Sequence, residues 1–209
     1  AAEDEEKKKK NLGYFVDSLK AAEALGAKRA VFHPGSASGG NRGEILERAC
    51  GFFKEIIAAL DEMELMNVTE TMGKINQLGD LDEVIALCNV DERIWPTIDF
   101  GHLHCRGLGS IKSKQDYADI LDRLENGIGT ERAKTMHVHF SRIEYTKGGE
   151  KMHHTFADTQ YGPEFMPLAE LVAERDYSPV FICESKGTMA EDAKAMKDMY
   201  FSAAKALLK

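Results

Sequence analysis

The chain has 209 residues, of which 43% are hydrophobic and 30% charged, and its formal net charge is −8. This length suits a single domain over residues 1–209 with a sizeable hydrophobic core, and the composition excludes a disordered chain. The acidic balance lacks the basic footprint of most nucleic-acid-binding proteins, and no segment approaches the roughly 18 apolar residues that a membrane span needs.

The N-terminus and the cysteines give expectations about the cellular compartment. The opening residues AAEDEEKKKK are charged where a secretory signal would be apolar, so we expect a cytoplasmic protein. The cysteines show no CxxC spacing, and each lies within an apolar run: Cys50, Cys88, Cys105 and Cys183. We therefore expect reduced, buried thiols rather than disulfides or a zinc finger.

Hydrophobic periodicity predicts an alternation of strands and helices. Apolar residues at three- and four-residue steps predict an amphipathic helix over residues 1–25. The short apolar runs that follow, predicted as strands, are 29–35, 67–73, 96–105, 133–143 and 179–187. The amphipathic helices predicted after them are 43–63, 80–88, 114–125, 164–175 and 190–207. Strands that alternate with helices indicate βα units and a parallel sheet.

An ionisable residue stands at or just after the C-terminal end of each of the five predicted strands. These residues are His33, Glu70, Asp99 with His102, His137 with His139, and Glu184. In a parallel barrel, catalytic and binding groups come from the C-terminal ends of the strands and the loops after them. A single ionisable residue at a strand end ordinarily has a structural role. Five successive strands that each end in a histidine or a carboxylate at the same rim of the barrel predict a metal site. Coordination of zinc, manganese or iron would offset the cost of burying these groups.

Two pairs of histidines leave the assignment of ligands open. Residues i and i+2 of a strand face the same side, so alternation alone does not separate His137 from His139. One of the two is expected to be a ligand and the other its neighbour. His102 and His104 pose the same ambiguity in the apolar run TIDFGHLHC, although Gly101 is expected to end the strand there.

Six motifs occur in a fixed order: VFHPGS, VTETMGK, TIDFGHLHC, MHVHF, KMHHTFAD and FICES. In this order they resemble the endonuclease IV family of apurinic/apyrimidinic endonucleases, which belongs to the xylose isomerase-like TIM barrels. The resemblance covers the chain from about residue 10. It implies an α/β fold of the (β/α)8 TIM barrel type, represented by its last five βα units, with the first three units absent.

The resemblance also implies a zinc cluster of two or three ions, for which manganese could substitute. The residues that match the family's metal ligands are His33, Glu70, Asp99, His102, His137, His153 and Glu184. Glu70 would bridge two ions, and Glu70 and Glu184 would be the catalytic residues. The implied reaction is hydrolysis of the phosphodiester 5′ to an abasic site, so the implied partner is abasic DNA. No protein partner is implied.

The loop before His153 departs from the family pattern. The family has an acid two residues before this histidine, whereas this chain has Lys151, and only the adjacent Glu150 could substitute. Three cationic residues of the same segment either contact phosphate or lie on a solvated hairpin: Arg142, Lys147 and Lys151.

Two other functions stay open. A Glu, Asp, His, Glu set resembles the single-metal site of sugar isomerases and epimerases: Glu70, Asp99, His137 and Glu184. There the metal would polarise a ketose and the two glutamates would move protons. The third interpretation is a non-enzymatic metal-binding or DNA-binding remnant, because a fold does not fix a function. The endonuclease is the favoured prediction.

Overall fold

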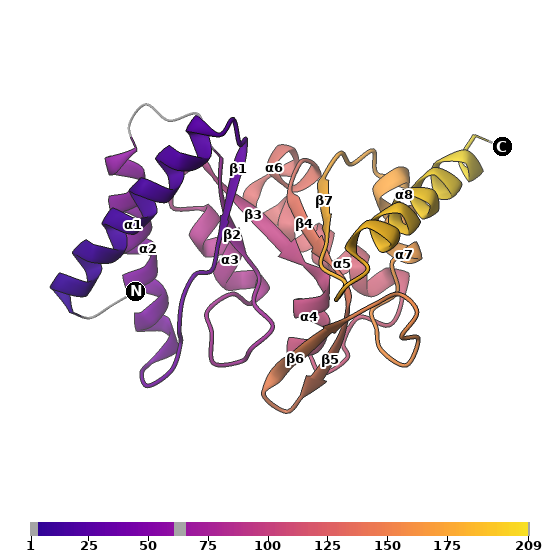
Figure 1. Ribbon diagram of the computed structural model, residues 1–209, viewed down its shortest axis with the longest axis horizontal. Coiled ribbons are helices and arrows are strands. Elements are labelled where there is room, and N and C mark those ends of the chain that lie inside the picture. The colour runs from indigo at the N-terminus through magenta and orange to yellow at the C-terminus, as the bar shows by residue number, and fades with distance from the viewer. Residues whose placement is uncertain (1–3, 61–65, 209) are drawn as a thin grey trace.

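The computed structural model describes residues 4–60 and 66–208 (Figure 1). The sheet strands are β1 (Arg29–Phe32), β2 (Met66–Glu70), β3 (Ile94–Asp99), β4 (His137–Phe140) and β7 (Val180–Cys183), and a hairpin is formed by β5 (Arg142–Thr146) and β6 (Gly149–His154). The helices are α1 (Glu5–Ala24), α2 (Arg42–Ala59), α3 (Leu81–Cys88), α4 (Phe100–Arg106), α5 (Lys114–Ile128), α6 (Thr130–Lys134), α7 (Met166–Glu174) and α8 (Met189–Ala206). The ends of two predicted helices, residues 1–3 and 61–63, lie outside the described residues.

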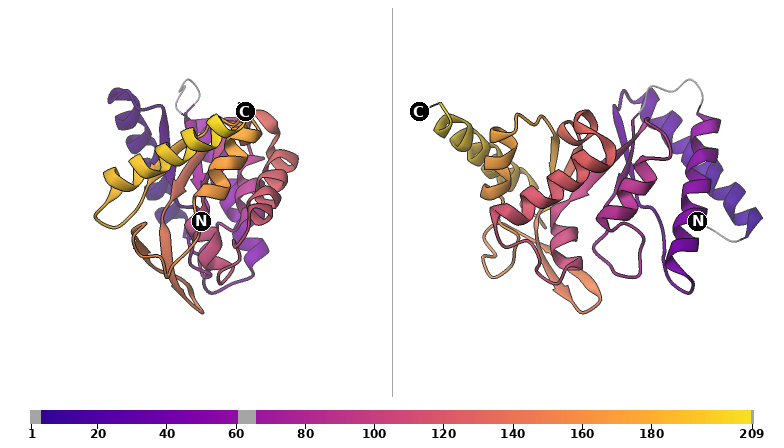
Figure 2. Two further views of the ribbon diagram at one scale, coloured as in Figure 1. Left: turned by 90° about the vertical axis from the view of Figure 1, so that its right-hand side faces the viewer. Right: turned by 180° about the vertical axis from the view of Figure 1, so that it is seen from behind.

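The five main strands form one parallel sheet in the order β1-β2-β3-β4-β7. Helices cover the outer face of this curved sheet, and the hairpin lies beside α4 at the ends of the strands (Figures 1 and 2). Within the described residues, β1 and β7 each pair with one neighbour, so the sheet is open at both edges. The arrangement is the five-unit part of a (β/α)8 barrel and confirms the predicted fold class. None of the helices in the described segments has the length and apolarity to cross a membrane.

The hydrophobic core lies between the sheet and its helices. Val84 of α3, Leu121 of α5 and Leu168 of α7 are fully buried in one cluster with Ile98 and Phe140 of the sheet. A second cluster joins α1 to α2 through three buried side chains: Leu19, Phe52 and Ile56. Burial of these apolar stripes fixes the helices on the outer face and thereby sets the inner face of the sheet.

The strand register decides which residues share the inner face. Paired residues of parallel strands point to the same side, and Glu70 pairs with Thr97, which pairs with His137. Two residues further along, Asp99 pairs with His139. The inner face therefore carries the ionisable residues of β2, β3 and β4 in two levels, with Asp99 and His139 nearer the C-terminal ends of the strands.

The segment TIDFGHLHC changes from strand to helix two residues before Gly101, the expected end of the strand. Strand β3 ends at Asp99, and α4 begins at Phe100. The Asp99 carboxylate accepts a hydrogen bond from the His102 backbone N–H at 2.7 Å, so it acts as the N-cap of α4. His102 and His104 are consequently helical residues two positions apart, which separates them around the helix axis.

Candidate metal centre

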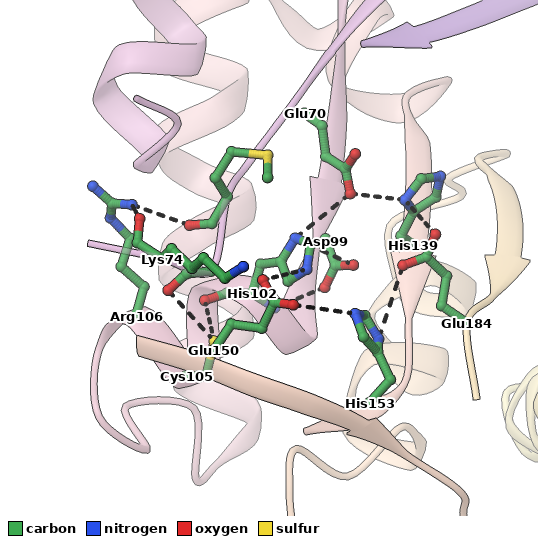
Figure 3. Close-up of polar contacts among 12 residues, drawn as sticks. Glu70, Lys74, Asp99, His102, Cys105, Arg106, His139, Glu150, His153 and Glu184 are labelled. Atoms are coloured by element: carbon green, nitrogen blue, oxygen red, sulfur yellow. Dashed lines mark hydrogen bonds and ion pairs between the residues drawn. The ribbon is translucent and has the colours of Figure 1, made fainter. Parts of the chain in front are cut away.

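Five of the ionisable residues predicted from the strand ends converge at the C-terminal edge of the sheet, namely Glu70, Asp99, His102, His139 and Glu184 (Figure 3). Glu70 lies at their centre and is 3% exposed. Its Oε1 lies 2.9 Å from His139 Nδ1 and 3.5 Å from His102 Nδ1, and its Oε2 lies 3.3 Å from His33 Nε2. Burial would raise the pKa of Glu70, but the contacts with His139 and His33 outweigh it and lower the pKa to about 2. Glu70 is therefore an anion that faces histidines from three separate elements.

Asp99 and His102 each present a buried atom that lacks a hydrogen bond. Thr71 O lies 2.8 Å from His102 Nδ1, a contact that places the proton on Nδ1 and leaves the lone pair of Nε2 free. His102 Nε2 and Asp99 Oδ2 are both buried without a hydrogen bond. An unsatisfied buried polar atom costs about 1–3 kcal/mol, more for a charged group. A cation between them would remove that cost, so these residues fit a bound metal.

Two groups of side chains have the spacing of metal ligands. Each group offers ligand atoms that all lie within 4.8 Å of one another: Glu70, Asp99, His102 and Glu184, and separately His102, His153 and Glu184. The groups share His102 and Glu184, so a single cluster of ions is the simplest occupancy. Carboxylate and imidazole ligands of this kind suit zinc and manganese.

Glu184 follows β7 and joins the two groups. Its Oε1 lies 3.2 Å from His139 Nδ1, and its Oε2 lies 3.9 Å from His153 Nδ1. Burial and then the negative charge of Asp99 raise the pKa of Glu184. Glu70 and Glu184 thus have opposite pKa shifts, which suits two carboxylates with different roles.

His139 makes the ion-pair contacts with the carboxylates, so it is a candidate ligand beside the predicted His137. His139 is level with Asp99, whereas His137 lies one level deeper, beside Thr97. Burial, His139 and then the Arg29 cation lower the pKa of His137 to about 4, so its ring is neutral. The two rings touch edge to face at 5.1 Å. His137 therefore lies level with Glu70 and one level below Asp99 and His139. Sequence alternation could not separate the two histidines because they share a face.

Glu150 lies near the position of the acid that the family has before His153, where this chain has Lys151. A register shift in the hairpin makes Lys151 an extra residue, since Tyr145 pairs with Glu150 and Glu144 pairs with Met152. The bulge brings Glu150 and His153 to the same face, and Glu150 Oε2 lies 3.6 Å from His102 Nε2. Glu150 Oε1 lies 3.9 Å from His153 Nε2. The acid three residues before His153 thus faces the cluster in this chain.

The other histidines considered in the sequence analysis lie around this centre. His33, in the loop after β1, is half-exposed at the rim, and Glu70 raises its pKa against the effect of burial. His153 lies with Nδ1 2.8 Å from Ser141 Oγ. His104 accepts a hydrogen bond from the Ile111 N–H and contacts Tyr145, away from the carboxylates.

Of the three cations left open between phosphate contact and a solvated hairpin, two are paired with carboxylates. Arg142 is 7% exposed and pairs with Glu164, so it holds the end of the hairpin. Lys151 pairs with Glu144, with which His154 also makes contact. Lys147 lies in the exposed turn between β5 and β6. The hairpin therefore supports the centre mainly through Glu150 and His153.

The sequence model of the xylose isomerase-like TIM barrel family matches residues 1–202, so the chain belongs to this family. An uncharacterized protein of Methanocaldococcus jannaschii is 33% identical over 189 residues, which cover 88% of this chain and 67% of that protein. A probable endonuclease 4 of Staphylococcus carnosus is 30% identical over 136 residues, which cover 63% of this chain and 44% of the relative. These matches bear out the predicted resemblance, and the chain spans about two thirds of the first relative and less than half of the second.

Solved structures share the fold at lower identity. A D-tagatose 3-epimerase-like protein superimposes with a TM-score of 0.77 at 18% identity, over 99% of this chain and 74% of that one. Endonuclease IV from Thermus thermophilus superimposes with a TM-score of 0.65, also at 18% identity, over 95% of this chain and 69% of that one. Both establish the architecture, which nucleases and epimerases share, and leave the reaction to the residues of the site.

Proposed function

We propose that this chain is a metal-dependent phosphodiesterase that hydrolyses DNA at abasic sites, with two or three zinc ions as cofactor. The observation that supports this proposal best is that two groups of potential ligands share His102 and Glu184. Shared ligands suit a cluster of metal ions rather than one isolated ion. The relationship to endonuclease 4 proteins supports the same reaction class. Ions bound here would activate water and offset the negative charge of the phosphodiester.

The roles of the chain's own residues follow from their surroundings. The proposed ligands are His33, Glu70, Asp99, His102, His139, His153, Glu184 and Glu150. Glu70, whose pKa is about 2, stays ionised and orients His33 and His139. Glu184, whose pKa is raised, is the carboxyl group best suited to take up or release a proton.

A sugar isomerase or epimerase is the second candidate function. The group of Glu70, Asp99, His102 and Glu184 is complete by itself and could hold one ion, as single-metal isomerisation requires. Two carboxylates with opposite pKa shifts would also suit proton transfer between neighbouring carbons of a sugar. The two functions therefore differ in the number of ions and in the substrate.

Elemental mass spectrometry of the purified protein, at known protein concentration, tests the two functions first. Two or three zinc ions per chain, together with cleavage of a duplex that contains one abasic site, would support the phosphodiesterase. One manganese or similar ion per chain, with turnover of a free ketose and no cleavage of DNA, would replace it with the isomerase.

A further inference from the structure

An open cleft adjoins the candidate metal centre on the side of β7. It has a volume of about 680 Å³ and lies between strand β6 of the hairpin and the loop that follows β7. His153 and Glu184, two proposed ligands, line it together with Met152, Ile182 and Lys186. A substrate that reaches the centre through this cleft would contact these side chains.

Lys186 places a positive charge at this cleft without a negative partner. Its Nζ lies 3.0 Å from Met152 Sδ, so the side chain reaches from the β7–α8 loop to the hairpin. A thioether is a neutral and weak acceptor, so this contact leaves the ammonium charge uncompensated. In the described part of the chain, no carboxylate oxygen lies within the 4.0 Å of an ion pair with Lys186. Lys151 and Arg142, by contrast, are paired with Glu144 and Glu164.

The position of Lys186 in the chain fixes its relation to the centre. It follows Glu184 by two residues and lies in the short loop before α8. Ser185, between them, is completely buried and anchors that loop. Lys186 therefore lines the same cleft as the two proposed ligands His153 and Glu184.

We infer that Lys186 binds a phosphate of the substrate next to the one that is hydrolysed. The inference rests on the proposed function and specifies its substrate as a chain with more than one phosphate. A lysine binds phosphate as a mobile point charge, and the weak contact with Met152 is readily exchanged for a phosphate oxygen. A free, uncharged sugar would offer this cation nothing to bind.

The test compares Lys186→Ala and Lys186→Arg with the unaltered zinc-loaded protein. Lys194→Ala is the matched control, since Lys194 pairs with Asp198 on the exposed face of α8. Duplex oligonucleotides with one tetrahydrofuran abasic-site analogue serve as substrate, and their binding is followed by fluorescence anisotropy at several salt concentrations. For Lys186→Ala we expect KM to rise about 10-fold, the loss of one charged hydrogen bond, with kcat within about twofold. The slope of log affinity against log salt concentration should fall by about one, and Lys186→Arg should restore most of the binding.

The outcomes separate this inference from the proposed function. DNA binding that depends on Lys186 without cleavage would support the inference and contradict the phosphodiesterase. Equal binding and cleavage by Lys186→Ala and the unaltered protein would overturn the inference and leave the phosphodiesterase standing. A loss of kcat at constant KM would also overturn it, because Lys186 would then act at the reacting phosphate. No binding of the duplex by the unaltered protein would overturn both.

Discussion

Glu70 Oε1 lies 2.9 Å from His139 Nδ1, although their strands β2 and β4 are separated in the sheet by β3. The contact spans the concave inner face of the sheet above Thr97, the residue with which Glu70 pairs. It brings the ionisable residues of β2 and β4 into one cluster with Asp99 of β3. The curvature of the barrel is thus what turns separate strand ends into a metal centre.

Replacement of Glu70 by Gln should impair the protein more than the loss of any single histidine. Glu70 faces three histidines and is the bridge between ions that the family resemblance implies. We expect activity to fall more than about 100-fold, beyond the usual effect of removing an outer partner of a metal ligand. Cleavage kinetics at limiting zinc would check this. Near-normal activity would contradict the bridging role.

His139→Ala and His137→Ala should have different effects on metal content. His139 contacts Glu70 and Glu184, so its removal should lower zinc affinity by more than about 10-fold. In the described residues no hydrogen bond or ion pair joins His137 to these carboxylates, so His137→Ala should keep the full zinc content. Elemental mass spectrometry of both variants, with circular dichroism to establish folding, is the measurement. Zinc loss in the His137 variant alone would support the original sequence assignment.

Glu150→Gln and Lys151→Met test the consequence of the hairpin bulge. Glu150 faces His102 and His153, while Lys151 pairs with Glu144. We expect Glu150→Gln to lose one ion per chain and Lys151→Met to lose none. Zinc titration by isothermal calorimetry would count the sites. As many sites in the Glu150 variant as in the unaltered protein would show that this carboxylate is not a ligand.

Without metal, the stability of the protein should depend on pH through Glu70 and its histidines. Burial opposes the lowered pKa of Glu70, but His139 and His33 outweigh it, so its contribution is complete above pH 4.5 and is lost as the pH falls toward 2. The pKa of His139 is raised by Glu70 against burial, so its contribution is complete below pH 6.5 and is lost as the pH rises through the raised pKa. The stabilisation from this contact is therefore greatest between about pH 4.5 and 6.5.

Urea denaturation in the presence of a chelator, at pH 5, 6, 7 and 8, would measure this dependence. The unaltered protein should lose free energy of unfolding above pH 6.5 more steeply than Glu70→Gln, which lacks the anion. Metal binding should show the opposite trend, because zinc competes with protons for the histidines and binds more tightly as the pH rises. If the free energy of unfolding depended on pH in the same way for both proteins, the contact between Glu70 and His139 would not be the source of the pH dependence.

Cys105→Ala should keep the metal and the activity. Burial is the main cause that raises the pKa of this thiol to about 12, so it is neither a thiolate nucleophile nor a ready ligand. Its Sγ lies 3.2 Å from His102 O and 3.7 Å from Gly73 O, both as hydrogen-bond acceptors. We expect a loss of about 1 kcal/mol in the free energy of unfolding with unchanged zinc content. Complete inactivation of a stably folded variant would show that the thiol takes part in the reaction.

The sequence by itself determined the βα array, the parallel sheet and the rim at which the ionisable residues gather. Hydrophobic periodicity is a local property, and strands that alternate with helices admit few arrangements. The order of six short sequence motifs was enough to indicate the family. The carboxylates Glu70, Asp99 and Glu184 were predicted correctly as neighbours, since each closes a strand.

Tertiary structure decided which histidine of each pair contacts the carboxylates. His137 and His139 share a face of β4, and only the register with β3 shows that His139 is level with Asp99. The bulge at Lys151 depends on pairing with β5, so the orientation of Glu150 could not be deduced from its position in the chain. These choices rest on contacts between residues far apart in sequence, which local patterns do not encode, and they fix the atoms available for chemistry.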